Sequence, residues 1–227
     1  MNEKIFFKDS HGHNLAAYYS QSDNMDAIVV MCHGLNSGKD SATNKELEKI
    51  FLENGISVFR FDFFGHKDSE GAIENRSVDE FVDNVISACA YVKNLGYKNI
   101  GIYAASFGGV AAAIAAPKIT ELKVLAFKAA GMGHTSRFMP NYEDDFKKKI
   151  WIEEAKQIRI PSLIVHGTKD TDVEIELGEA LADSIPGSRR LFYEGADYRF
   201  SREEDFKRMI DDISNFMTPI LLNVFLK

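Results

Sequence analysis

The chain has 227 residues, of which 45% are hydrophobic and 27% charged. This is the composition of one ordinary globular domain and excludes a disordered, collagen-like or disulfide-framed chain. With 34 acidic and 27 basic side chains the net charge is -7, so we expect no general attraction to nucleic acid or to an anionic membrane. Cys32 and Cys89 lie in apolar stretches and are expected to be buried thiols.

We expect no secretory signal at the N-terminus, because no basic segment is followed by an apolar run and a small-residue cleavage site. No stretch approaches the roughly 20 apolar residues of a membrane span. We therefore expect a cytoplasmic protein that does not enter membranes. The sequence predicts no particular oligomeric state.

Two short strands, at 3–8 and 14–20, flank a turn and predict an antiparallel hairpin. The apolar runs that follow are typical of strands buried on both faces. They begin at residues 27, 56, 99, 123, 162 and 189. Segments with helical spacing lie between them, at 43–54, 78–95, 106–116, 174–184 and 203–217. This alternation predicts one α/β domain over 1–227, with a mostly parallel, doubly wound sheet.

Residues 131–158 interrupt the alternation of strands and helices and are rich in aromatic side chains, including the single tryptophan, Trp151. An insertion at the carboxyl edge of a parallel sheet lies over the place where such folds bind ligands. We therefore expect a short lid or cap. The alternative is an ordinary crossover helix whose aromatic side chains pack on the sheet.

The segment NIGIYAASFGG, residues 99–109, places Ser106 between a buried strand and a helix of small residues. A nucleophilic serine in such a tight turn needs small residues two positions before and after it. Ala104 and Gly108 satisfy this requirement, although glycine is usual at both places. The pattern predicts a nucleophile elbow at Ser106.

The first long buried strand ends in the loop that begins His33-Gly34-Leu35. An oxyanion hole takes one backbone N–H from the residue after the nucleophile and one from this loop. The predicted donors are therefore Phe107 and Leu35. His33 is expected to hold the loop through a backbone hydrogen bond rather than to transfer protons.

Five segments in this order resemble the α/β-hydrolase family, in particular its small bacterial feruloyl- or cinnamoyl-type esterases and serine-aminopeptidase-like hydrolases. They are HGLNSGKDS, FRFDFFGHKDSEG, AASFGG, HGTKDTDV and EGADYRFS, within residues 26–217. The resemblance implies the α/β-hydrolase fold and ester hydrolysis by a Ser-His-Asp triad. It also implies that His66 and Asp68 organise a loop, and that Asp170, rather than Asp172, is the triad acid.

The triad base is missing from this pattern. The family histidine follows Glu-Gly-Ala-Asp, where this chain has Tyr198, and no histidine follows His166. At pH 7 a free phenol is ionised in roughly one molecule per thousand, whereas an imidazole is largely available as a base. The other groups considered as a base are His134, in the insertion, and Lys169, beside Asp170; neither is favoured.

Three hypotheses remain open. The chain is a serine hydrolase of ester or acyl substrates with an impaired or unconventional base, a catalytically inactive binder of a small acyl compound or a protein, or a variant of an active enzyme whose histidine became tyrosine. The first is favoured, because Ser106 and Asp170 are both retained. No metal or organic cofactor is expected, because the histidines and cysteines lack ligand spacing.

Overall fold

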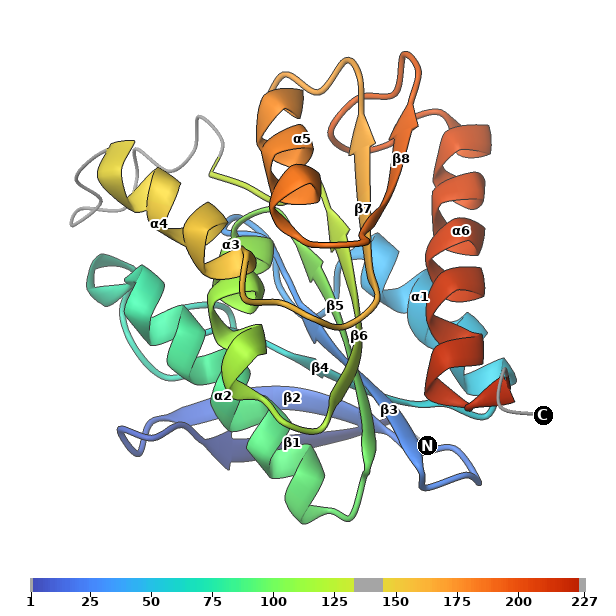
Figure 1. The fold of residues 1–227 in the computed structure, drawn as a ribbon. Coiled ribbons are helices and arrows are strands. Elements are labelled where there is room, and N and C mark those ends of the chain that lie inside the picture. Colours follow the sequence, from blue (N-terminus) through green and yellow to red (C-terminus); the bar gives the residue numbers. More distant parts are fainter. Residues whose placement is uncertain (1, 133–144, 225–227) are drawn as a thin grey trace.

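The computed structural model describes residues 2–132 and 145–224, and within these residues one sheet of eight strands forms the centre of the molecule (Figure 1). The strands are β1 (Asn2–Lys8), β2 (Asn14–Ser20), β3 (Ala27–Cys32), β4 (Ser57–Phe61), β5 (Asn99–Ala105), β6 (Leu122–Lys128), β7 (Ser162–Gly167) and β8 (Arg189–Tyr193). Their order is β1-β2-β4-β3-β5-β6-β7-β8. The hairpin β1–β2 is antiparallel and β2 joins β4 antiparallel, whereas β3 to β8 are mutually parallel. The predicted fold class is confirmed.

Helices cover both faces of the sheet, as the doubly wound arrangement requires. They are α1 (Ala42–Glu53), α2 (Val78–Asn94), α3 (Phe107–Ala115), α4 (Asp145–Ala155), α5 (Ile175–Ser184) and α6 (Glu203–Leu221), with short 3-10 turns at Ile73–Asn75 and Ala116–Lys118. The helices α2, α3, α4 and α5 pack on one face, and α1 and α6 on the other (Figure 1). The carboxyl ends of β3, β5, β6 and β7 therefore meet at one edge, where ligands bind in such sheets.

Strand β3 shows why the apolar runs are continuous. Its six residues are all buried. Because side chains alternate across a strand, Ile28 and Val30 enter the core beneath α2 and α3, whereas Val29 and Met31 enter the core beneath α1 and α6. A strand covered on both faces has no position for a solvated side chain, so the sequence pattern predicts it well.

Helix α6 is longer than the sequence pattern indicates, ending at Leu221 rather than at 217. The added turn is stabilised by packing on β5 at Gly101. A Cβ atom at Gly101 would lie 3.0 Å from Met217 Cε and 3.2 Å from Leu221 Cδ1. The absence of a side chain at Gly101 therefore makes room for the end of α6.

The described part of the expected lid is α4. Trp151 is fully buried and packs with Ala155 and Ile158 in the core that α2, α3 and α5 share. This part of 131–158 is thus a crossover helix packed in the core. The remainder, 133–144, lies outside the described residues, so the lid stays a prediction.

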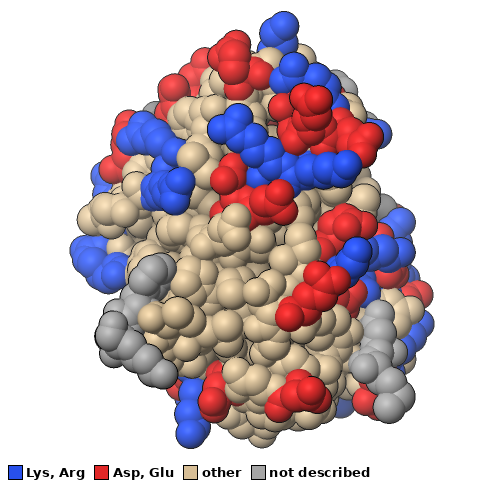
Figure 2. Space-filling model, turned by 90° about the vertical axis from the view of Figure 1, so that its right-hand side faces the viewer, with Lys and Arg blue, Asp and Glu red and all other residues tan. Residues whose placement is uncertain are grey.

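The face that carries α1 and α6 has acidic and basic side chains intermixed over its upper part and a largely uncharged centre (Figure 2). No single sign of charge dominates this face. Among the described residues, no helix is long and apolar enough to cross a membrane.

Candidate active site

Ser106 occupies the turn between β5 and α3 in a conformation that non-glycine residues rarely adopt. Its φ of 51° and ψ of -125° lie outside the regions favoured by L-residues, and such a conformation costs about 1–3 kcal/mol. The surrounding backbone holds it, because Ser106 N–H donates to Lys128 O at 2.9 Å and Ser106 O accepts Gly109 N–H at 2.8 Å. Ser106 is buried, at 8% exposure.

Small residues permit this turn, as the sequence pattern requires. A Cβ atom at Gly108 would lie 2.4 Å from His33 O, and one at Gly109 would lie 2.5 Å from Ala130 Cβ. Gly34 brings the loop after β3 against the serine, since a Cβ there would lie 3.0 Å from Ser106 Cβ. Ala104, where glycine is usual, is fully buried in the core.

The expected oxyanion donors have free N–H groups. Among the described residues, neither Leu35 N–H nor Phe107 N–H donates a hydrogen bond. Phe107 is the first residue of α3, where backbone N–H groups lack intrahelical acceptors. The arrangement therefore leaves both donors available to a ligand.

His33 orients the peptide that carries Leu35 N–H. Its Nδ1 lies 2.7 Å from Gly34 O, and its Nε2 accepts Phe63 N–H at 3.1 Å. Burial lowers the pKa of His33 to about 3, so the ring is neutral and Nδ1–H donates to Gly34 O. In a trans peptide the N–H points opposite to the C=O, so this bond directs Leu35 N–H away from His33.

A second set of contacts holds the loop that follows β3. His66 Nε2 lies 2.6 Å from Leu35 O. Asp68 and the fully buried Asp62 bind the Lys39 ammonium at 2.7 and 2.5 Å. His66 and Asp68 are thus loop-organising residues, as the family resemblance implies.

Tyr198 and Ser106 line the same cavity, and both side chains lie close to Gly34. The Tyr198 hydroxyl would be 3.4 Å from a Cβ atom at Gly34, so the same glycine admits both side chains. Burial raises the pKa of Tyr198, the nearby charges of Asp170 and Asp172 raise it further, and the hydrogen bond to Ser106 opposes this. The phenol is therefore protonated at neutral pH.

Lys128 is a neighbour of this pair that the sequence interpretation missed. It ends β6, is buried at 7% exposure, and places its Nζ 4.6 Å from the centre of the Tyr198 ring. Nζ also donates to Tyr198 O at 2.6 Å. Burial lowers the pKa of Lys128 to about 8, and the charge of Asp170 opposes this. A lysine within the apolar run KVLAFKA was the available signal, because buried lysines are rare.

Asp170 follows β7 and its side chain is fully buried. Its Oδ1 accepts the N–H groups of Asp172 and Val173 at 2.9 and 2.8 Å. Its Oδ2 lies 3.2 Å from His166 Nε2, a ring nitrogen that is also 3.0 Å from Val173 O. Among the described residues Oδ2 makes this contact with His166 but has no hydrogen-bond partner. The role of Asp170 as triad acid stays a prediction.

Two other candidate bases were considered, His134 and Lys169. His134 lies outside the described residues. Lys169 is exposed and is not among the residues that line the cavity at Ser106.

A cavity of about 460 Å³ opens at Ser106. Its wall combines the loop after β3, the start of α1 and the segment around Tyr198, and it includes Leu35, Thr43, Tyr103, Lys128 and Phe206. This volume is within the range of small-molecule sites, roughly 300–1,000 Å³. In the described part of the chain, no cluster of metal-ligating side chains lies in this cavity.

The chain is similar in structure to several esterases and hydrolases. Est1E from Butyrivibrio proteoclasticus, solved with ferulic acid bound, has a TM-score of 0.79 and 19% identity, covering 96% of this chain and 99% of that one. The Pyrococcus furiosus esterase Pf2001 has a TM-score of 0.76 and 16% identity, over 96% and 93%. Dienelactone hydrolase from Anabaena variabilis ATCC 29413 has a TM-score of 0.77 and 15% identity, over 95% and 96%.

These identities are low, so the structural comparison establishes the fold. No curated protein matches the chain significantly in sequence. The sequence model of the family described as serine aminopeptidase, S33, matches residues 23–150, more than half of the chain. The order of the strands and this match together lead to one conclusion. The chain belongs to the serine aminopeptidase S33 family of α/β-hydrolases.

Proposed function

We propose that this protein is a serine hydrolase of small carboxylic esters in which Ser106 is the nucleophile. The observation that carries the proposal is the conformation of Ser106, a non-glycine residue with φ of 51° inside a cavity of about 460 Å³. Strained residues of this kind concentrate at functional sites. This conformation supports Ser106 as the group that meets a bound ester.

The reaction is acyl transfer in two steps. The Ser106 hydroxyl loses its proton and attacks the ester carbonyl carbon, and the negative charge that forms on the carbonyl oxygen is held by Leu35 N–H and Phe107 N–H. Collapse of the tetrahedral intermediate breaks the ester C–O bond and releases the alcohol, which takes a proton. Water then attacks the acyl-serine, restores the serine hydroxyl and releases the acid.

The proton of Ser106 passes to Tyr198 in this proposal, and only the phenolate form of Tyr198 accepts it. Because the pKa of Tyr198 is raised by burial, that form is scarce at neutral pH and turnover is slow. Lys128 acts on this step. Its ammonium, 4.6 Å from the ring centre, favours the phenolate by Coulomb attraction and binds the Tyr198 carbonyl, which fixes the side chain.

The proposed substrates are esters with a compact acyl group. The cavity has room for an aromatic acyl chain, and its wall includes the aromatic rings of Tyr103 and Phe206. Est1E, a structural relative of this chain, binds ferulic acid. Hydroxycinnamate esters are therefore the first aromatic substrates to assay, beside short aliphatic esters.

A second function is binding of a small acyl compound without turnover. The observation that favours it is the raised pKa of Tyr198, which keeps the phenol protonated at neutral pH. In this case the cavity holds its ligand, and Ser106 does not form an ester with it.

The test measures hydrolysis of p-nitrophenyl acetate, p-nitrophenyl butyrate and methyl ferulate, and covalent labelling by a fluorophosphonate probe. The variants are Ser106→Ala, Tyr198→Phe and Lys128→Met, with Ser184→Ala on helix α5 as the matched serine control. We expect the unaltered chain to hydrolyse these esters slowly and to be labelled by the probe. Ser106→Ala should abolish both hydrolysis and labelling, and Ser184→Ala should leave both intact. Tyr198→Phe and Lys128→Met should lower the rate of hydrolysis.

Binding of methyl ferulate without hydrolysis or labelling would instead support the second function. If hydrolysis persists in Ser106→Ala, the assignment of the nucleophile is wrong.

A further inference from the structure

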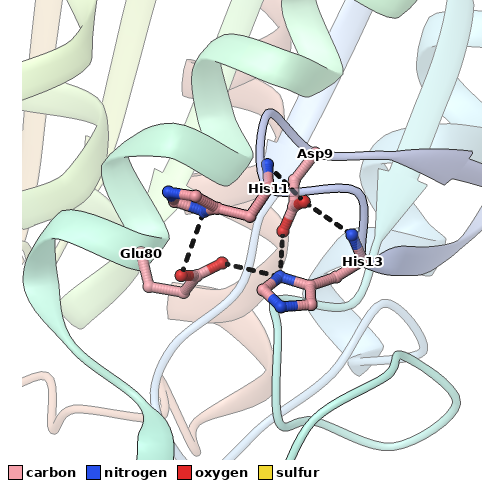
Figure 3. A group of neighbouring side chains, drawn as sticks. All are labelled: Asp9, His11, His13 and Glu80. Carbon is pink, nitrogen blue, oxygen red and sulfur yellow. Dashed lines mark hydrogen bonds and ion pairs between the residues drawn. The ribbon is translucent and has the colours of Figure 1, made fainter.

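A group of metal-ligating side chains lies outside the cavity, where the β1–β2 turn meets the first turn of α2 (Figure 3). We name it the hairpin cluster. Its members are Asp9, His11, His13 and Glu80. One donor atom of each residue lies within 4.8 Å of those of the other three. None of the four lines the cavity at Ser106.

We propose that the hairpin cluster binds one divalent transition-metal cation, with zinc as the best match. Two imidazoles and two carboxylates make up the donor set, and imidazole nitrogen favours zinc, copper, nickel and iron over magnesium and calcium. Tetrahedral zinc with nitrogen and oxygen ligands at about 2.0–2.1 Å separates its ligand atoms by roughly 3.3 Å.

The donor atoms are close to this spacing. His13 Nδ1 lies 2.8 Å from Asp9 Oδ2 and 3.6 Å from Glu80 Oε1, and His11 Nδ1 lies 3.4 Å from Glu80 Oε2 (Figure 3). The same nitrogen of each histidine, Nδ1, faces the carboxylates. Small rotations of the side chains are therefore enough to place all four atoms around one ion.

Surrounding contacts hold the carboxylates in position. Asp9 Oδ1 accepts the N–H groups of His11 and His13 at 3.0 and 2.8 Å, which leaves Oδ2 turned toward the cluster. Asn84 Nδ2 lies 3.4 Å from Asp9 Oδ2 and 3.1 Å from Glu80 Oε1. Supporting hydrogen bonds of this kind orient metal ligands.

The His13 ring is also fixed, because its centre lies 4.4 Å from that of Phe64. His11 is different, with 55% of its side chain exposed. The cluster thus has three partly or fully buried ligands and one exposed ligand, which gives a cation a path from solvent.

The sequence interpretation expected no metal, because the histidines and cysteines lack ligand spacing along the chain. Glu80 is remote in sequence and joins His11 and His13 only when α2 packs beside the hairpin. A bound cation would connect the hairpin turn to α2 and stabilise this contact. The proposal is independent of the hydrolase function, since the cluster is outside the cavity.

The test uses the full chain without an affinity tag, treated with a chelator and then titrated with Zn²⁺ by calorimetry. Co²⁺ is a second probe, because tetrahedral Co²⁺ absorbs visible light, and Mg²⁺ and Ca²⁺ are the matched negative cations. The variants are His11→Ala, an exposed position that does not endanger folding, and Glu80→Gln, which keeps the side-chain size. Ser10→Ala is the control in the same turn.

We expect the chain to bind one Zn²⁺. At a free Zn²⁺ concentration of about a hundred times Kd, Tm should rise by roughly 5–10 °C. His11→Ala and Glu80→Gln should each weaken binding by at least about tenfold to a hundredfold, since loss of supporting residues alone has that effect. Ser10→Ala should bind as the unaltered chain does. Equal binding by all variants, or no binding at millimolar Zn²⁺, would show that these residues only fix the turn through hydrogen bonds.

Discussion

Replacing Tyr198 by histidine is expected to increase ester hydrolysis by about a thousandfold at pH 7. A phenol with an ordinary pKa near 10 is ionised in roughly one molecule per thousand at this pH, whereas most imidazole is the free base. Burial raises the pKa of Tyr198 above its usual value, so the base available in the unaltered chain is scarcer still. The gain in available base therefore sets the order of magnitude of the effect.

Asp170 is the proposed partner for the new imidazole. Asp170 Oδ2 is buried without a hydrogen-bond partner among the described residues, and an imidazole at 198 would donate Nδ1–H to it while Nε2 faces Ser106. Loss of this acid has reduced kcat by about 10⁴-fold in a serine protease. The nearby Lys128 ammonium disfavours a second positive charge, so the imidazole stays neutral and available as a base.

The assay is steady-state hydrolysis of p-nitrophenyl acetate between pH 6 and 9. With tyrosine at 198, kcat/KM should rise with pH throughout this range, because the phenolate fraction grows. With histidine, it should reach a plateau once the imidazole is neutral. The controls are Tyr198→His combined with Ser106→Ala and with Asp170→Asn.

Two results would refute the reasoning. A folded Tyr198→His chain with no increase in activity and no faster fluorophosphonate labelling of Ser106 would show that more than the base is missing. Equal activity of Tyr198→His with and without Asp170→Asn would remove Asp170 from the proposed triad.

Three further predictions concern groups around the site. Because burial lowers the pKa of Lys128 to about 8, the unfolded chain binds more protons than the folded chain between pH 8 and 10. The free energy of unfolding should therefore rise with pH relative to Lys128→Met, by up to about 3 kcal/mol; urea titrations at pH 7.5 and 10 that give a constant difference would contradict this. Gly34→Ala adds a Cβ atom 3.0 Å from Ser106 Cβ. In the Tyr198→His background this change should lower kcat by about 100-fold with little change in Tm. An unchanged kcat would show that the loop after β3 shifts to accommodate the added methyl group. Asp62→Asn weakens a buried ion pair with Lys39 at 2.5 Å and should cost about 3–5 kcal/mol of stability, measured by urea unfolding; a loss below 1 kcal/mol would mean that other groups replace it.

Sequence patterns predicted most of the helices and strands, because helix capping and the burial of a strand on both faces each leave a pattern within the segment itself. Ser77 begins α2, and its side chain accepts Glu80 N–H at 3.1 Å, as the Ser-x-x-Glu spacing indicates. The bounds of β3 and β7 follow from runs that are buried on both faces. The end of α6 was not predictable in this way, since it depends on the space at Gly101, a residue of β5.

Ser106, Leu35 and Phe107 could be selected from sequence because the strand-turn-helix context specifies them within a few residues. Lys128 could not be assigned a role, since its neighbour Tyr198 is distant in the chain and becomes adjacent only where β6 and the segment after β8 meet. The hairpin cluster could not be predicted for the same reason, since Glu80 lies in α2 and the two histidines lie in the β1–β2 turn.

The sequence by itself determined the fold class, the strained serine turn and the absence of a histidine at position 198. These depend on periodicity, on residue size and on order along the chain. The tertiary structure decided the electrostatic surroundings: the raised pKa of Tyr198, the lowered pKa of Lys128 and the burial of the Asp170 carboxylate. Burial and distance between charges control such properties, and both arise only when remote segments pack together.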